Sequence, residues 1–310
     1  MTLIEAEIRS KSSQTHTSNQ LDSFFNLMKP RVMSLVLFTC SVGLIIAPNN
    51  LNFYNSAMSL LAVALGAGAA GTLNMWYESD LDAIMSRTCL RPIPSGKVTK
   101  KQALAFGLFL SIFSIGLLYF YANLFAAFLL LITISFYFFI YTVWLKRKTP
   151  QNIVIGGAAG ALPPVIGWSI STGTISLEPI ILFLIIFFWT PSHFWALSLY
   201  KSDDYKKANI PMLPVISGSE KTKQNILIYS ILMLPTVSAY YFFNLSSLIY
   251  FVPSLGLTLY YIFLCINLLK TKTIKKRNIV AKKIFVFSIF YLFALFVLIL
   301  LDNFFVNFYG

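Results

Sequence analysis

The chain has 310 residues, of which 57% are hydrophobic and only 11% are charged, and its mean hydropathy is +0.73. This composition excludes an ordinary soluble domain, which needs far more charge to stay dissolved. A formal net charge of +13 would suggest nucleic acid as a partner of a soluble protein, but here the placement of the charges points to a membrane instead. The three cysteines lie far apart and show neither metal-binding nor disulfide spacing.

The first segment, residues 1–27, is polar and predicts a disordered N-terminal arm. Its acids Glu5 and Glu7 fit neither a signal peptide nor an arginine-rich transit peptide. We expect residues 28–310 to form a single transmembrane domain.

Apolar segments then recur along the chain, each long enough to cross a hydrocarbon core of ~30 Å. About nine spans are predicted, near residues 32–48, 57–77, 103–121, 123–145, 152–171, 178–200, 225–244, 247–268 and 284–306. The expected fold class is therefore all-α, a polytopic membrane helical bundle.

The loops between these spans differ in charge from one side to the other. With the N-terminus on the inside, one side receives the arm and all of the basic loops, 78–102, 146–151, 201–224 and 269–283. The opposite loops, around 49–56, 122, 172–177 and 245, contain no Lys or Arg. Because basic loops stay in the cytoplasm, we expect a bacterial inner-membrane protein with a cytoplasmic N-terminus and a periplasmic C-terminus.

At the end of the second span, residues 74–92 read NMWYESDLDAIMSRTCLRP. Asn74, Glu78 and Asp82 are four residues apart, so they form one stripe on a helix, whereas Asp80 points elsewhere. Carboxylates this close to a bilayer usually face a cavity or a partner. Two explanations stay open: salt bridges to Arg87 and Arg91, or a Mg²⁺ site in which those arginines bind phosphate oxygens.

A third inner segment, LKRKTPQNIVIGG (145–157), places Lys146 and Asn152 at the same membrane level. Lys146 fits a topology determinant, and its height also suits binding of diphosphate oxygens. In the helix that follows, Gly156 and Gly160 form a GxxxG step that favours close helix packing.

A second acidic cluster follows the sixth span, in WTPSHFWALSLYKSDDYKKANIPMLP (189–214). On a continuous helix, His193, Tyr200 and Asp204 fall near one line, with Asp203 beside it and Lys201 next to the acids. Two acid clusters with basic neighbours at one membrane edge favour a site for a metal-bridged polyanion. His193 is explained either as a packed, hydrogen-bonded residue or as a contact to an acceptor substrate.

These segments resemble the intramembrane prenyltransferase (UbiA) superfamily, whose hallmark is two Asp-rich motifs on facing helices. The first motif, NxxxDxxxD, is similar to Asn74-x3-Glu78-x3-Asp82, and the second, DxxxD, to Tyr200-x3-Asp204, with Asp203 as a substitute ligand. Three longer segments resemble its protohaem IX farnesyltransferase branch: DxDxxMxRTxxRP (80–92), TPQNIVIGGAAGALPPVIGW (149–168) and WTPSHFWALSLYKSDDYKKANIPMLPV (189–215).

The resemblance implies transfer of a farnesyl group from farnesyl diphosphate to a vinyl group of protohaem IX (haem B), which gives haem O. It implies a Mg²⁺ cofactor held by Asn74, Glu78, Asp82 and Asp204, with Asp203 as a further catalytic acid. Expected substrate-binding residues are Arg87, Arg91, Lys146, Lys201, Tyr200, Asn152 and His193.

The expected partners are farnesyl diphosphate, haem B and the lipid bilayer, with no nucleic acid, and a downstream haem-modifying enzyme or terminal oxidase would receive the product. Two alternatives stay open at this stage. One is a polytopic transporter of an anionic or isoprenoid solute, and the other is a prenyltransferase acting on a quinone precursor.

Overall fold

A computed structural model describes residues 20–48 and 51–309, and every regular element among them is a helix. Eight helices or helix pairs in this part of the chain are long and apolar enough to cross a membrane. They are α4 (Phe53–Tyr77), α6 (Lys100–Tyr121), α7 (Leu124–Ser135) with the π-helix η1 (Phe136–Leu145), α8 (Asn152–Ala161) with α9 (Pro163–Thr172), α10 (Leu177–Tyr200), α13 (Gly218–Phe242), α14 (Leu248–Leu269) and α15 (Ile274–Tyr309). A ninth is the pair α2 (Gln20–Leu27) and α3 (Pro30–Ile45), which is bent by 50°. The all-α, multi-pass prediction is confirmed.

The polar arm ends earlier than the sequence predicts. Residues 1–19 lie outside the described residues, but Gln20–Leu27, expected to be disordered, form α2. Leu27 is fully buried, and the ring of Phe24 lies 5.0 Å from that of Phe106 on α6. The arm therefore becomes ordered where apolar side chains reach the bundle, a tertiary effect that local polarity does not reveal.

Polar side chains fix where several helices begin. Thr99 and Gln102 form a reciprocal capping box at the start of α6, which satisfies two backbone N–H groups. Asn123 caps α7, and its side-chain amide also donates to the Ser169 carbonyl on α9 at 2.8 Å. These caps set the ends of the spans at which the loops turn.

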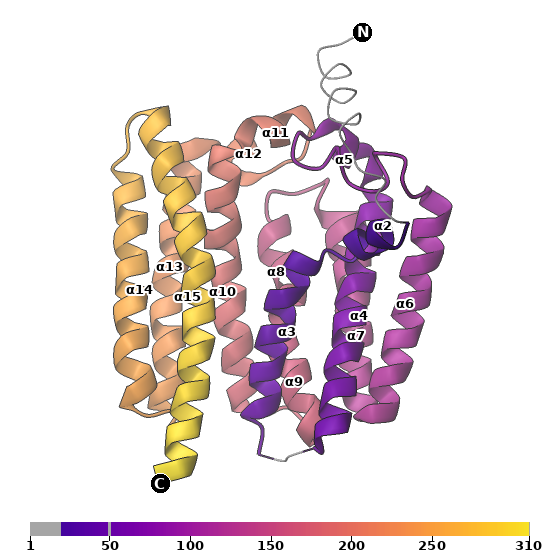
Figure 1. Cartoon of the computed structure of the whole chain (residues 1–310). Helices are drawn as coiled ribbons and strands as arrows, with labels where there is room; N and C mark the ends of the chain where they lie inside the picture. Colours follow the sequence, from indigo (N-terminus) through magenta and orange to yellow (C-terminus); the bar gives the residue numbers. More distant parts are fainter. Residues whose placement is uncertain (1–19, 49–50, 310) are drawn as a thin grey trace.

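Three short helices connect spans at one end of the bundle. α5 (Ser79–Ile84), α11 (Ser202–Lys207) and α12 (Leu213–Ile216) all lie at the upper end in Figure 1. We call this end, which carries segments 78–99, 146–151, 201–217 and 270–273, the charged edge. The last helix, α15, ends at the opposite side (Figure 1).

Small residues let the interior helices approach closely. A Cβ on Gly167 of α9 would overlap the Cys40 carbonyl oxygen on α3, and one on Gly43 of α3 would overlap that of Pro164. In the predicted GxxxG step, Gly156 lies directly against the Tyr141 ring, whereas Gly160 has open space around it. Close packing at this step therefore involves only its first glycine. Because Gly156 has no side chain, η1 packs closely against α8 beside the charged edge.

Candidate active site

The stripe formed by Asn74, Glu78 and Asp82 continues beyond the end of α4. α4 ends at Tyr77, but the Glu78 N–H donates to the Asn74 carbonyl at 3.0 Å and the Asp82 N–H to the Glu78 carbonyl at 2.8 Å. The four-residue spacing therefore continues through the break into α5. Asn74, Glu78 and Asp82 are all buried, with 2%, 2% and 3% of their surface exposed.

Each member of this stripe has a cationic partner from a different part of the chain. Lys29, between α2 and α3, donates to Asn74 Oδ1 at 2.6 Å. Lys146, at the end of η1, pairs with Glu78 Oε2 at 2.5 Å. Arg91 Nη1 contacts both oxygens of Asp82 at 2.8 Å. We call these six residues the first cluster. Buried charges are tolerated only when they are paired in this way, so the first cluster is one interdependent electrostatic unit.

The cluster also shifts the protonation equilibrium of its lysine at the end of η1. Burial alone disfavours the Lys146 ammonium, but the Glu78 carboxylate outweighs this effect and raises the pKa of Lys146 above its ordinary value. Lys146 therefore carries a positive charge at neutral pH. A permanent cation at this depth suits the binding of an anionic group.

Two buried oxygens of the site have no hydrogen-bond partner among the described residues. They are Glu78 Oε1 and Asn152 Oδ1, the latter at the start of α8. Asn152 is fully buried and donates through its Nδ2 to the Thr149 carbonyl at 2.6 Å. Unsatisfied buried oxygens are costly, so they mark places where a cation or donor of a ligand fits.

The donor set fits Mg²⁺, which prefers oxygen ligands and usually takes one or two carboxylates plus substrate phosphates. Glu78, Asp82 and the amide oxygen of Asn74 are such donors. In residues 20–48 and 51–309, no three His, Cys, Asp or Glu side chains are close enough to hold an ion by themselves.

Asp80 lies outside the stripe, as its position on the helix predicts. Asp80 is exposed, and its two carboxylate oxygens form a bidentate ion pair with the two Nη atoms of Arg147, at 2.9 and 3.0 Å. Partial burial works against the charged form, but the Arg147 hydrogen bonds outweigh it and hold the pKa of Asp80 below its ordinary value. This pair ties α5 to the end of η1.

The second cluster, which comprises Tyr200, Lys201, Asp203 and Asp204, is built differently. α10 ends at Tyr200, Lys201 has non-helical dihedrals, and α11 begins at Ser202, so the continuous helix assumed for His193, Tyr200 and Asp204 is wrong. Lys201 and Asp203 are exposed. Asp204 Oδ2 accepts a hydrogen bond from Ser86 Oγ at 3.0 Å. The two acid-bearing loops therefore do meet, through a single neutral donor.

His193 lies away from both clusters, in the interface of α10 with α15. Its ring stacks between Trp189 and Phe285, with centroids 4.3 and 4.6 Å away, and its Nδ1 lies 2.6 Å from Ser288 Oγ. It is only 7% exposed. Of the two explanations left open by the sequence, this geometry favours packing.

Arg87 also differs from the expectation of a counter-ion. It is exposed and has no ion pair among the described residues, whereas its neighbour Arg91 is paired. Arg87 is therefore available at the charged edge for a ligand.

Sequence reasoning missed two members of the site. Lys29 adopts a left-handed conformation, with φ of 56°, where α2 turns into α3. Thr142, on η1, accepts a hydrogen bond from Asn74 Nδ2 at 3.1 Å and donates to the Tyr137 carbonyl, five residues back. The only sequence signal for Lys29 was Pro30, because a residue before proline is disfavoured in the helical region and marks a break. Nothing in the apolar run 136–145 indicated a π-helix, an element often found at functional sites.

The chain is similar to known proteins over most of its length. Residues 36–290 match the model of the UbiA prenyltransferase family. The chain is 60% identical to a protoheme IX farnesyltransferase of Pelagibacter ubique, over 97% of this chain and 99% of that protein. It is 46% identical to a protein of the same name from Parvibaculum lavamentivorans, over 94% and 96% of the two chains.

Solved structures show the same fold at much lower identity. A digeranylgeranylglyceryl phosphate synthase superposes with a TM-score of 0.76 at 18% identity, covering 92% of this chain and 99% of that one. A UbiA homolog from Archaeoglobus fulgidus, bound to GPP and Mg²⁺, superposes with a TM-score of 0.65 at 17% identity, over 89% and 99% of the chains. With a family match over most of its length and near full-length relatives, this chain belongs to the UbiA prenyltransferase family.

Proposed function

We propose that this protein transfers the farnesyl group of farnesyl diphosphate to a vinyl group of protohaem IX, giving haem O and diphosphate. The observation that carries the proposal is the first cluster, in which buried oxygen donors and partly buried basic groups alternate at the membrane edge of an apolar bundle. The substrate pair is taken from the relatives named protoheme IX farnesyltransferase, which match almost the whole chain. The same relatives argue against a transporter or a quinone-precursor enzyme.

In the first cluster, Asn74, Glu78 and Asp82 would hold Mg²⁺, and Asp204 is the candidate ligand from the second cluster. The chemistry that bound Mg²⁺ supplies is neutralisation of the negative charge that develops on the leaving diphosphate. The free, buried Glu78 Oε1 supports this assignment. The relative bound to GPP and Mg²⁺ shows that the family's fold accepts this ligand pair.

The cations of the first cluster would bind the diphosphate. Lys29, Lys146 and Arg91 are now engaged with Asn74, Glu78 and Asp82. With Asn74, Glu78 and Asp82 holding Mg²⁺, Lys29, Lys146 and Arg91 would be free to bind the diphosphate oxygens. Metal and diphosphate should therefore bind together, because either one alone leaves buried charges unpaired.

Farnesyl transfer itself would use this electrostatic site and the apolar interior. As the C–O bond of farnesyl diphosphate breaks, its electron pair leaves with the diphosphate, whose growing charge is stabilised by Lys29, Lys146 and Arg91. The vinyl group then supplies the electron pair of the new C–C bond, and water quenches the remaining cation with release of a proton. The buried interior protects the allylic cation from earlier capture by water.

We also propose the orientation. The charged edge and the helix ends beside it contain the basic segments 78–102, 146–151, 201–224 and 269–283, and the opposite connections contain no Lys or Arg. By the positive-inside rule, this edge faces the cytoplasm of a bacterial inner membrane, and the C-terminus faces the periplasm. Farnesyl diphosphate would then enter from the inner leaflet, and the haem product would pass to a haem-modifying enzyme or terminal oxidase.

The test is a mass spectrum of the porphyrin that purified protein forms from haem B and farnesyl diphosphate. We expect haem O with Mg²⁺ and none after chelation with EDTA. Glu78→Gln and Asp82→Asn should each lower its formation by about 10²–10³-fold, the cost of losing one stabiliser of transition-state charge. Undiminished haem O in both variants, at normal protein levels, would overturn the metal assignment.

A further inference from the structure

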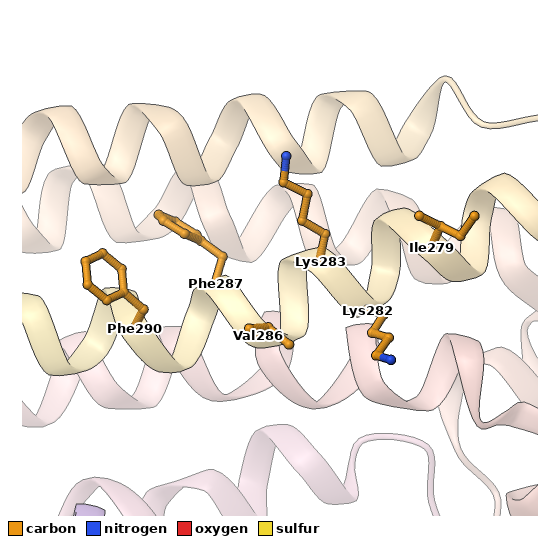
Figure 2. A pocket seen from close by; sticks show the side chains of 6 residues that line it. All are labelled: Ile279, Lys282, Lys283, Val286, Phe287 and Phe290. Atoms are coloured by element: carbon orange, nitrogen blue, oxygen red, sulfur yellow. The ribbon is translucent and has the colours of Figure 1, made fainter.

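A shallow, open groove of about 660 Å³, lined by residues of α15 alone, lies on the outer face of this helix, far along the chain from the first cluster. It is lined by Ile279, Lys282, Lys283, Val286, Phe287 and Phe290. Figure 2 shows the two lysine side chains extending to opposite sides of the helix, with the two phenylalanines further along it. The lysines lie between Ile279 and the other apolar residues, so we call Lys282 and Lys283 the cationic end of the groove and Val286, Phe287 and Phe290 its apolar end.

The apolar end is held in place by packing against α14. The Phe287 ring lies 4.9 Å from that of Tyr260 in an edge-on arrangement and 5.9 Å from that of Tyr261. Val286 and Phe290, by contrast, are 57% and 55% exposed. A fixed aromatic wall beside exposed apolar side chains suits an acyl chain.

The cationic end lies at the level of lipid phosphates. After Lys283, residues 284–301 contain no charged side chain, and the next charge is Asp302. This stretch is about 27 Å long at ~1.5 Å per residue, close to the ~30 Å thickness of the hydrocarbon core. Lys282 and Lys283 therefore lie where the hydrocarbon ends on the side of the charged edge.

Neither lysine has a partner within the protein. Among residues 20–48 and 51–309, neither forms an ion pair, whereas Lys146 and Lys223 do. Both Lys282 and Lys283 are exposed. Two unpaired ammonium groups at phosphate depth above an apolar groove complement the charge and shape of an anionic lipid.

We propose that the α15 groove is a binding site for one anionic phospholipid of the leaflet at the charged edge. Lys283 binds the headgroup phosphate from the side of Phe287, Lys282 attracts it from the other side of the helix, and an acyl chain lies along Val286, Phe287 and Phe290. The lipid stabilises the outer side of α15, whose inner side packs on α10 through the His193–Phe285 stack. A general role of these lysines in membrane topology would not require a groove or lipid selectivity.

The experiment measures lipid binding by native mass spectrometry of delipidated protein in detergent. Phosphatidylglycerol and phosphatidylcholine with identical acyl chains are added in equal amounts. We expect phosphatidylglycerol to be preferred about tenfold, and the K282Q/K283Q variant to lose this preference, because each lysine contributes an electrostatic attraction to the anionic headgroup. K282R/K283R should keep it.

The matched control is K275Q/K276Q, which removes the same charge from the same helix about two turns before the groove. It should bind phosphatidylglycerol like the unaltered protein, and inorganic phosphate should not displace the lipid. Equal binding of both lipids by the unaltered protein, or equal losses in the two glutamine variants, would overturn the proposal. If K282Q/K283Q fails to fold, the lipid preference of the unaltered protein and of K282R/K283R still tests the proposal.

Discussion

The two acid-bearing ends of the bundle lie at the same edge but differ in how their charges are satisfied. In the first cluster, Glu78 and Asp82 are buried and paired with Lys146 and Arg91. In the second cluster, Asp203 is exposed, and the side chain of Asp204 has, within residues 20–48 and 51–309, only the neutral donor Ser86. The fold therefore supplies the carboxylates of the first cluster with charged partners. The carboxylates of the second cluster lack such partners in the described residues and would obtain them from a ligand.

This difference follows from where the partners come from. The cations of the first cluster stand on segments far apart in sequence, before α3, at the end of η1 and after α5, so the packing of several spans fixes them. The second cluster draws on a single turn between α10 and α11. A site preorganised by packing stabilises developing charge without rearrangement, so the first cluster should supply most of the catalytic effect.

The sharpest test of this asymmetry compares one acid from each cluster. Asp82→Asn should lower haem O formation about 10²–10³-fold, as expected for a lost stabiliser of transition-state charge. Asp203→Asn should lower it less than about tenfold, because an exposed carboxylate contributes little in water. Turnover of the two variants, measured at matched protein levels in the same membranes, checks the ranking. Equal losses would show that both ends contribute alike.

The next effect concerns stability. Lys146→Met leaves the buried Glu78 carboxylate without its partner and should destabilise the protein by roughly 3 kcal/mol, at the lower end of the range for a broken buried pair. Thermal unfolding in detergent measures this loss.

The control for this variant is Lys148→Met, at an exposed position two residues on, which should leave the melting temperature unchanged. The double variant Lys146→Met/Glu78→Gln should recover most of the stability but no activity. If the double variant recovers no stability, Lys146 acts through packing and not through charge.

A smaller effect is expected at Lys29, the cation that packing brings to Asn74. Lys29→Gln should raise the KM for farnesyl diphosphate about 10- to 100-fold, which corresponds to a lost hydrogen bond to a charged group of ~1.5–3 kcal/mol. Arg31→Gln removes a charge from an exposed position at the start of the same α3 and serves as the control. An unchanged KM in Lys29→Gln would remove Lys29 from the substrate site.

Sequence alone predicted the parts of the molecule that depend on local patterns. Hydropathy located the eight candidate spans of the described residues and the bent α2–α3 pair, because a bilayer selects for long apolar runs, and helical periodicity placed Glu78 and Asp82 on one stripe. Prediction from sequence failed where tertiary contacts determine the local conformation. The left-handed Lys29, the turn that separates Asp204 from the line of His193, and the π-helix that positions Lys146 all depend on packing between distant spans.

The smallest effect tests the hydrogen bond from Ser86 to Asp204, which joins the two acid-bearing loops. Ser86→Ala removes the donor to Asp204 and should weaken the contact between the two loops by about 0.5–1.5 kcal/mol, a typical net value for a neutral hydrogen bond. We expect the concentration of Mg²⁺ that supports half-maximal activity to change by less than about tenfold, with little change in maximal rate. The direction discriminates between two roles. A lower requirement for Mg²⁺ would mean that Ser86 competes with the metal for Asp204, whereas a higher one would mean that Ser86 holds Asp204 in place to receive it.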